Sequence, residues 1–192
     1  ALNPNNDVNM SQSTNDVYPT ALRVATILSS YRLMDALAQL ADAFAAKGLE
    51  FNHILKVGRT QLQDAVPMTL GQEFTAFAIT LREDVARLRD GLTLMREVSL
   101  GGTAIGTGIN ADPAYADLAI AELSAITGEA LVRSENLVEA TSDTGAFVMF
   151  SGILKRVALK LSKIASDLRL LSSGPRAGFG EINLPAMQAG SS

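Results

Sequence analysis

The sequence predicts an all-α protein, a bundle of long antiparallel helices, from three observations. The 192 residues are 47% hydrophobic but contain few aromatic residues and no Trp, a composition that suits packed helices better than a sandwich or a barrel. Apolar residues recur at steps of three and four over long stretches, and glycine-rich polar segments separate these stretches. A chain of this length normally forms one domain, so we expect a single helical-bundle domain over residues 1–192.

The first helix is expected after a polar, turn-rich segment, residues 1–15. Asn15 or Asp16 can cap this helix, and Pro19 is tolerated in its first turn. Apolar residues at helical spacing follow, and Gly48 is expected to end the helix.

The second helix is expected after an extended connection, because residues 49–68 combine β-forming residues with glycine and proline. Thr69-Leu-Gly-Gln72 has the pattern of a capping box, which places the start of the helix there. The glycine-rich segment 101–110 then interrupts the helix. Its apolar stripe consists of Phe74, Phe77, Leu81, Val85, Leu88, Leu92 and Met95.

A short third helix is expected from Asp112-Pro113 to about Gly128, and the fourth has the clearest pattern in the chain. Residues off its main stripe, such as Val148 and Leu159, are apolar too, and a helix that is apolar on more than one face must be surrounded. We therefore expect self-association, with a monomeric bundle around a thick core as the alternative. The heptad-like stripe consists of Phe147, Phe150, Leu154, Val157, Leu161, Ile164, Leu168 and Leu171.

Composition excludes several classes of function. With 16 basic and 20 acidic residues the net charge is -4, which gives no reason to expect nucleic acid or a membrane as a partner. The absence of Cys excludes disulfides and thiolate metal sites and fits a reducing compartment, so we expect a cytoplasmic protein. No apolar run approaches the ~20 residues needed to span a bilayer. Both ends are loop-like and the first residue is not Met, so we expect a fragment of a longer protein.

Chemistry is expected in four polar segments at helix ends: residues 9–16, 56–64, 101–110 and 173–192. All are rich in Ser, Thr, Asn, Gln and Gly. His53 is the only histidine and is expected to be structural or on the surface, so neither a Ser-His-Asp triad nor a histidine metal site can be assembled. Neutral donors at helix N-termini suit an anion instead, because backbone N–H groups and the helix dipole add to them.

Each polar segment taken alone also has a simpler interpretation. "SQSTND" can be a well-capped helix start, and Lys56 and Arg59 can be surface charge. "GGTAIGTGIN" is glycine-rich but does not match G-x-x-x-x-G-K-[ST] and follows no strand, which disfavours a nucleotide site. Taken singly, the segments indicate only a soluble helical bundle with hydroxyl-rich loops.

Taken together and in order, the four segments resemble the fumarase/aspartase superfamily. The matching motifs are "NMSQSTNDVYPTA", "KVGRTQLQDAVPMTLGQEF", "GGTAIGTGIN" and "SGPRAGFGEINLPAMQAGSS", which cover essentially the whole chain. The resemblance implies the central helical domain of that fold. In this superfamily "GSS" begins a flexible loop, so the resemblance also implies that the rest of the loop and the N- and C-terminal domains lie outside this chain.

Individual residues within these motifs resemble the aspartase branch of the superfamily more than the fumarase branch. "SQSTND" stands where fumarases usually have "SQSSND", and Gln61 and Asn3 stand where they usually carry His. The resemblance implies a lyase of amino-acid metabolism that eliminates ammonia from L-aspartate in the anti sense, reversibly, to give fumarate. A fumarate hydratase of the same superfamily and a non-catalytic helical oligomerisation module are the alternatives.

The resemblance implies a role for each candidate site residue. Ser191 is the expected general base, Thr60 and Gln61 would bind the substrate carboxylates, and Ser13 and Thr14 would contact the carboxylate where charge develops. The remaining candidates are Asn15, for the α-amino group or the adjacent carboxylate, and Thr107 and Ser192, as substrate or loop support.

The reaction implied by the resemblance has an electrostatic barrier, because removing the Cβ proton builds a second negative charge beside a carboxylate. Fixed donors around this enediolate are worth about 2.7–4 kcal/mol each, so no metal or cofactor is expected to be required. An activating divalent cation such as Mg²⁺ is compatible with this. The superfamily gathers each site from several subunits of a homotetramer, so we expect a homotetramer with shared sites and an isolated 192-residue chain that is inactive.

Overall fold

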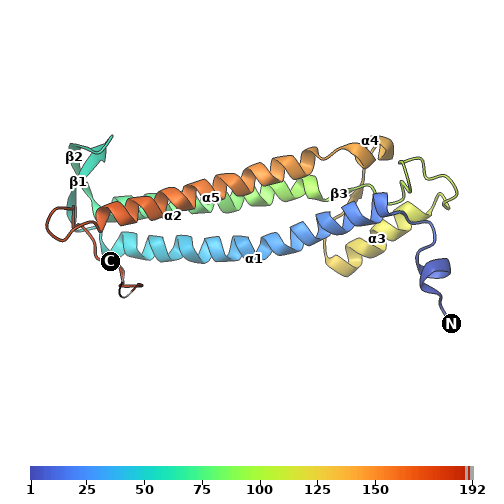
Figure 1. Ribbon diagram of the computed structural model, residues 1–192, viewed down its shortest axis with the longest axis horizontal. Coiled ribbons are helices and arrows are strands. Elements are labelled where there is room, and N and C mark those ends of the chain that lie inside the picture. Colours follow the sequence, from blue (N-terminus) through green and yellow to red (C-terminus); the bar gives the residue numbers. More distant parts are fainter. Residues whose placement is uncertain (189, 191–192) are drawn as a thin grey trace. The chain divides into compact units, whose positions relative to one another are not determined.

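The computed structural model of the chain describes residues 1–188 and 190 and is mostly helical (Figure 1). The predicted protein of long helices is confirmed by α1 (Thr14–Glu50), α2 (Leu70–Met95) and α5 (Gly145–Leu171). The shorter helices are α3 (Tyr115–Thr127), α4 (Leu137–Ser142) and a π-helical turn, Pro4–Val8. Two strand pairs were not predicted: β1 (Leu55–Thr60) with β2 (Gln63–Thr69), antiparallel, and β3 (Glu97–Val98) with β4 (Val132–Arg133), parallel.

The chain divides into two compact units. Unit 1 consists of Ala1–Asp35 and Ala86–Ile153, and unit 2 consists of Ala36–Val85 and the chain from Leu154 onward. Each unit contains a segment of α1, of α2 and of α5.

The core of unit 1 lies among its segments of α1, α2 and α5 and the short helix α3. Ile27 of α1 and Leu88, Leu92 and Met95 of α2 have no exposed surface. Gly91 brings α2 close to α5, because a Cβ at this position would lie 2.5 Å from Cδ1 of Ile153. The predicted apolar stripe of the second helix is therefore the side that packs in the core.

The core of unit 2 is built around an aromatic cluster that joins the end of α1 to the start of α2. Phe44 and Phe51 pack edge-on against Phe74, and Phe44 also packs against Phe77, with ring centroids 5.2 to 5.9 Å apart. Edge-to-face contacts of this kind add to the free energy gained by burying the rings.

The prediction that Gly48 ends the first helix is wrong, because α1 continues to Glu50. Gly48 packs against α2: a Cβ here would lie 2.4 Å from Oγ1 of Thr75, and a Cβ at Gly71 would lie 2.3 Å from the carbonyl oxygen of Gly48. The missing side chain therefore serves the close approach of two helices rather than a helix stop.

The predicted capping box at the start of α2 is confirmed. The backbone N–H of Thr69 donates to Oε1 of Gln72 at 2.9 Å, and the N–H of Gln72 donates to Oγ1 of Thr69 at 3.1 Å. The end of the third helix is confirmed as well, because Gly128 adopts the left-handed conformation at φ 73° and closes α3. The sequence patterns that mark a helix start or end were therefore correct at these two positions. Gly48 differs from them because it packs against a neighbouring helix.

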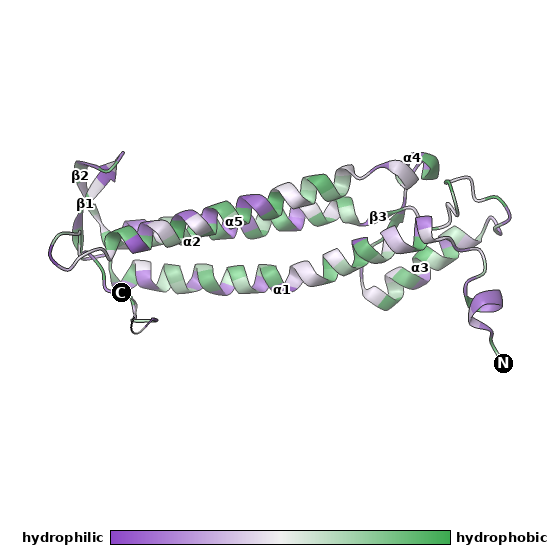
Figure 2. Cartoon of the chain, in the orientation of Figure 1, coloured by the Kyte–Doolittle hydropathy of each residue, from purple (hydrophilic) through white to green (hydrophobic). Residues whose placement is uncertain are grey.

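The stripe of α5 is buried at every seventh residue. Phe150, Val157, Ile164 and Leu171 are 4 to 5% exposed, while Val148, Met149 and Leu159 lie at the surface of this chain. Apolar and polar colours alternate along the helix (Figure 2). The apolar side chains that are off the stripe thus stay uncovered within one chain.

Candidate functional site

The first turn of α1 is organised by a reciprocal cap between Ser13 and Asp16. The N–H of Asn15 donates to Oγ of Ser13 at 3.2 Å, and the N–H of Ser13 donates to Oδ1 of Asp16 at 2.9 Å. This is a capping box with an aspartate at its fourth position. The cap is therefore Ser13 rather than Asn15 or Asp16 as predicted, and Asp16 acts as its partner in the capping box.

Asp16 also holds the glycine-rich segment 101–110 against the start of α1. Its Oδ2 accepts the N–H groups of Gly101 at 3.1 Å and Thr103 at 3.0 Å, and its side chain is completely buried. Three backbone N–H groups thus surround one carboxylate, an arrangement that stabilises the charge despite burial. Sequence reasoning treated Asp16 only as a cap, and its partners 85 residues away left no local signal.

The candidate Asn15 contacts the loop that carries the candidate Thr107. Nδ2 of Asn15 donates to the carbonyl oxygen of Ala104 at 2.7 Å, and Thr107 lies three residues farther along the same loop. Thr14 and Thr107 are both exposed. In unit 1 the side chain of Asn15 thus joins the start of α1 to the glycine-rich loop.

The glycine-rich loop keeps this shape because glycines fill its closest contacts. A Cβ at Gly101, where φ is +92°, would lie 2.4 Å from Cβ of Ala116, and a Cβ at Gly106 would lie 2.3 Å from the carbonyl oxygen of Leu137. The loop is thus pressed against the starts of α3 and α4, and only residues without a side chain fit there.

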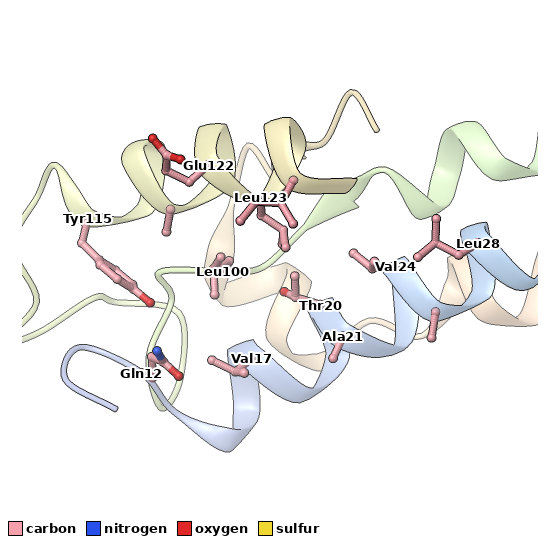
Figure 3. A pocket seen from close by; sticks show the side chains of 13 residues that line it. Gln12, Val17, Thr20, Ala21, Val24, Leu28, Leu100, Tyr115, Glu122 and Leu123 are labelled. Atoms are coloured by element: carbon pink, nitrogen blue, oxygen red, sulfur yellow. The ribbon is translucent and has the colours of Figure 1, made fainter. Parts of the chain in front are cut away.

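A cavity of about 560 Å³ lies between the start of α1 and α3, lined by Val17, Val24, Leu100 and other apolar residues (Figure 3). The ring of Tyr115 extends toward Gln12 at one end of the cavity (Figure 3). Burial, and then the charge of Asp16, raises the pKa of the Tyr115 phenol. The predicted substrate residues Ser13, Thr14 and Asn15 are not among its lining residues, and an apolar wall does not suit a small anion.

Thr60 and Gln61 lie at the tip of the β1–β2 hairpin in unit 2. Gln61 and Leu62 form the two-residue turn with φ of 51° and 63°, the pattern of a type I′ turn that matches the twist of the strands. Both candidate side chains are exposed. The predicted extended connection is therefore a hairpin that carries these two residues at its tip.

The prediction that Lys56 and Arg59 can be plain surface charge is wrong. Their side chains are 7% and 17% exposed, and both form ion pairs with Glu181 in the segment after α5. Lys56 also pairs with Glu73 of α2. We call these four residues the Glu181 cluster.

The contacts of the Glu181 cluster shift the pKa values of Glu181 and Arg59. Burial raises the pKa of Glu181, but the hydrogen bonds and charges of Arg59 and Lys56 outweigh burial and leave this pKa below its ordinary value. The hydrogen bond to Glu181 likewise raises the pKa of Arg59. The carboxylate therefore stays ionised at neutral pH with two cations beside it.

The remaining candidates are placed as follows. Ser13, Thr14, Asn15 and Thr107 belong to unit 1, and Thr60 and Gln61 belong to unit 2. Ser191 and Ser192 lie outside the described residues. His53 is exposed, as predicted for a surface residue.

The described residues contain neither a grouped set of metal ligands nor a helix that could span a membrane. Among residues 1–188 and 190, no three His, Cys, Asp or Glu side chains are grouped to hold a metal ion. Within that same part of the chain, no helix has the length and apolarity needed to cross a membrane.

The whole chain matches known proteins. A model of the family described as "Lyase" matches residues 1–192. The chain is similar to the aspartate ammonia-lyases of Pseudomonas fluorescens, at 67% identity over 192 residues, and of Escherichia coli (strain K12), at 59% over 191 residues. It is covered completely by both, and it spans about 40% of the length of each.

Solved structures share the fold. A Brucella melitensis protein described as fumarate lyase:delta crystallin, bound to cobalt, is 68% identical with a TM-score of 0.96 over 99% of this chain and 41% of its own. A class II fumarase from Schistosoma mansoni is 32% identical with a TM-score of 0.90 over 100% of this chain and 43% of its own. Sequence and structure thus agree over the full extent of the chain, which belongs to the lyase family.

Proposed function

We propose that the native polypeptide carrying these residues is an aspartate ammonia-lyase, which converts L-aspartate to fumarate and ammonia. The observation that carries the proposal is the junction between the start of α1 and the glycine-rich loop, where the buried carboxylate of Asp16 links Ser13 to Gly101 and the side chain of Asn15 donates to Ala104. The 67% identity to an aspartate ammonia-lyase supports the choice of substrate. The hydroxyl and amide groups fit a substrate that carries two carboxylates.

In the proposed reaction, the side-chain oxygen of Ser191 takes a proton from Cβ of L-aspartate. The electron pair of the C–H bond passes into the adjacent carboxylate to form an enediolate, and then becomes the double bond as the Cα–N bond breaks. The electron pair of that bond leaves with nitrogen, so the α-ammonium group departs as ammonia. Ser13 and Thr14 donate to the carboxylate that gains charge, Asn15 holds the α-amino group or the adjacent carboxylate, and Thr60 and Gln61 hold the substrate carboxylates.

We further propose that residues 1–192 act as one helical domain within a homotetramer whose sites are shared between subunits. The exposed apolar residues Val148, Met149 and Leu159 of α5 support this, because an apolar helix face that one chain leaves uncovered favours burial against another. Thr107 and Ser192 then serve as loop support within the shared site.

The proposal is tested with the native polypeptide by measuring ammonia release from L-aspartate. Ser13→Ala and Thr60→Ala should each lower kcat/KM by about 100-fold or more, the cost of removing one preorganised donor. Ser29→Ala removes an exposed hydroxyl elsewhere on α1 and should leave kcat/KM within about two-fold.

Two results would count against the proposal. Hydration of fumarate without ammonia release would identify a hydratase instead, an alternative favoured by the structural match to a class II fumarase. Full ammonia release in both Ser13→Ala and Thr60→Ala would overturn the roles given to these residues, and would favour the alternative in which residues 1–192 are a non-catalytic helical oligomerisation module of the longer polypeptide.

A further inference from the structure

The segment that follows α5 is fixed to the hairpin by one carboxylate. Oε1 of Glu181 lies 2.6 Å from an η nitrogen of Arg59, and Oε2 lies 3.0 Å from Nζ of Lys56. The Glu181 side chain is 17% exposed, the same as that of Arg59. An ion pair sequestered to this degree is worth more than an exposed one, because water and salt screen it less.

The two cations reach the same carboxylate because the hairpin is irregular between them. Residues three apart in a regular strand point to opposite faces, yet Lys56 and Arg59 both meet Glu181. The register of β1 against β2 shifts between Val57 and Arg59, and a Cβ at Gly58 would lie 2.8 Å from the carbonyl oxygen of Val66. Bulges of this kind redirect side chains, and here the redirection gives Glu181 two partners.

The backbone of the segment is ordered at the same place. The N–H groups of Gly180 and Glu181 donate to the carbonyl oxygens of Ser173 and Leu171 at 2.7 and 2.9 Å. The guanidinium group of Arg59 lies 4.0 Å from the ring centre of Phe179. Residues 179–181 are thus held by backbone hydrogen bonds and by side-chain contacts with Arg59 and Lys56.

We propose that Glu181 is a positioning residue of the active site. Through Arg59 it joins the strand that ends in Thr60 to the segment that leads, ten residues later, to Ser191. The carboxylate thereby fixes both the strand that carries the carboxylate-binding hairpin tip and the start of the segment that leads to the base, whichever of the shared sites each of them serves. The catalytic part of this inference rests on the proposed function, whereas the structural coupling does not.

The test uses Glu181→Gln in the native polypeptide, with two readouts. Hydrogen exchange at the amides of Gly180 and Glu181 should become at least about ten-fold faster, because the substitution removes both ion pairs that hold the segment. The kcat for ammonia release from L-aspartate should fall about ten-fold or more. KM should change less than kcat, because Glu181 itself does not touch the substrate.

Two control variants separate positioning from a general loss of stability. Glu181→Asp keeps the charge and should restore at least part of both readouts. Asp42→Asn breaks the exposed ion pair with Arg82 in the same unit and should leave both within about two-fold.

Each outcome has a distinct meaning. Unchanged exchange in Glu181→Gln overturns the coupling, whatever the enzyme does. Faster exchange with unchanged kcat overturns the positioning role. If the unaltered polypeptide releases no ammonia from L-aspartate, the proposed function and the positioning role fail together, while the exchange result still decides the structural coupling.

Discussion

Asp16→Asn is the sharpest test of how the site in unit 1 is held together. The substitution keeps the shape of the side chain but replaces one carboxylate oxygen with an amide nitrogen. In the structure, Oδ1 accepts one N–H, from Ser13, and Oδ2 accepts two, from Gly101 and Thr103. The best orientation of Asn leaves its oxygen facing the loop and its NH₂ group facing the N–H of Ser13.

The magnitude follows from these three hydrogen bonds. A bond to a charged group is worth about 1.5–3 kcal/mol and a neutral one about 0.5–1.5 kcal/mol. Asn therefore weakens two bonds by about 1 kcal/mol each and loses the third. Relief from burying a charge offsets part of this, so the free energy of unfolding should fall by about 2–4 kcal/mol.

The assay is denaturant unfolding of the native polypeptide, combined with hydrogen exchange at Gly101 and Thr103. Exchange at these two amides should accelerate in Asp16→Asn, because the loop has lost its anchor. Asp90→Asn is the matched control: it breaks an exposed pair with Arg87 in the same unit and should cost under about 0.5 kcal/mol. Equal losses in the two variants, or unchanged exchange in the loop, would refute the anchoring role.

Two further predictions concern pH and glycine. Because the folded-state pKa of Glu181 lies below its ordinary value of 4.5, its contribution to stability is complete above that pH and is lost as the pH falls through the folded-state pKa. Exchange at Glu181, corrected for intrinsic rates, should therefore accelerate below pH 4.5. Glu181→Gln should remove part of this dependence, and an identical profile in both proteins would contradict it. Gly101→Ala should destabilise by more than about 2 kcal/mol, because it combines a positive φ with a Cβ 2.4 Å from that of Ala116. Gly152→Ala, at a helical position with no described atom within 4 Å, should stabilise by about 0.5–1 kcal/mol; melting curves that shift in the same direction would show the reasoning to be wrong.

Local patterns accounted for much of the fold. Three features were predictable because each depends on neighbouring residues. They are the Thr69–Gln72 capping box, the end of α3 at Gly128, and the buried positions of α5, which recur every seven residues. The prediction for Gly48 was wrong, because the absence of a side chain there allows α2 to pack closely against α1 and does not end α1. A helix stop and a close helix contact both call for glycine, so the residue alone could not distinguish them.

The candidate site was predictable only in part. The hydroxyl- and amide-rich segments with Ser13, Asn15 and Thr60 were evident from composition and motif. The contacts of the two charged residues were not predictable. In the sequence, Asp16 has the pattern of a helix cap and Glu181 that of a loop residue. Their roles depend on partners that are close in space but remote along the chain.

The sequence by itself determined the long helices, the capping box of α2, the end of α3 and the family, because side-chain periodicity, capping and motif order act over short stretches of chain. Only the tertiary structure decided which carboxylates are buried and which backbone groups they anchor. Asp16 meets Gly101 across 85 residues of chain, and the free energy of such a contact depends on distance and burial in space, which no local pattern records.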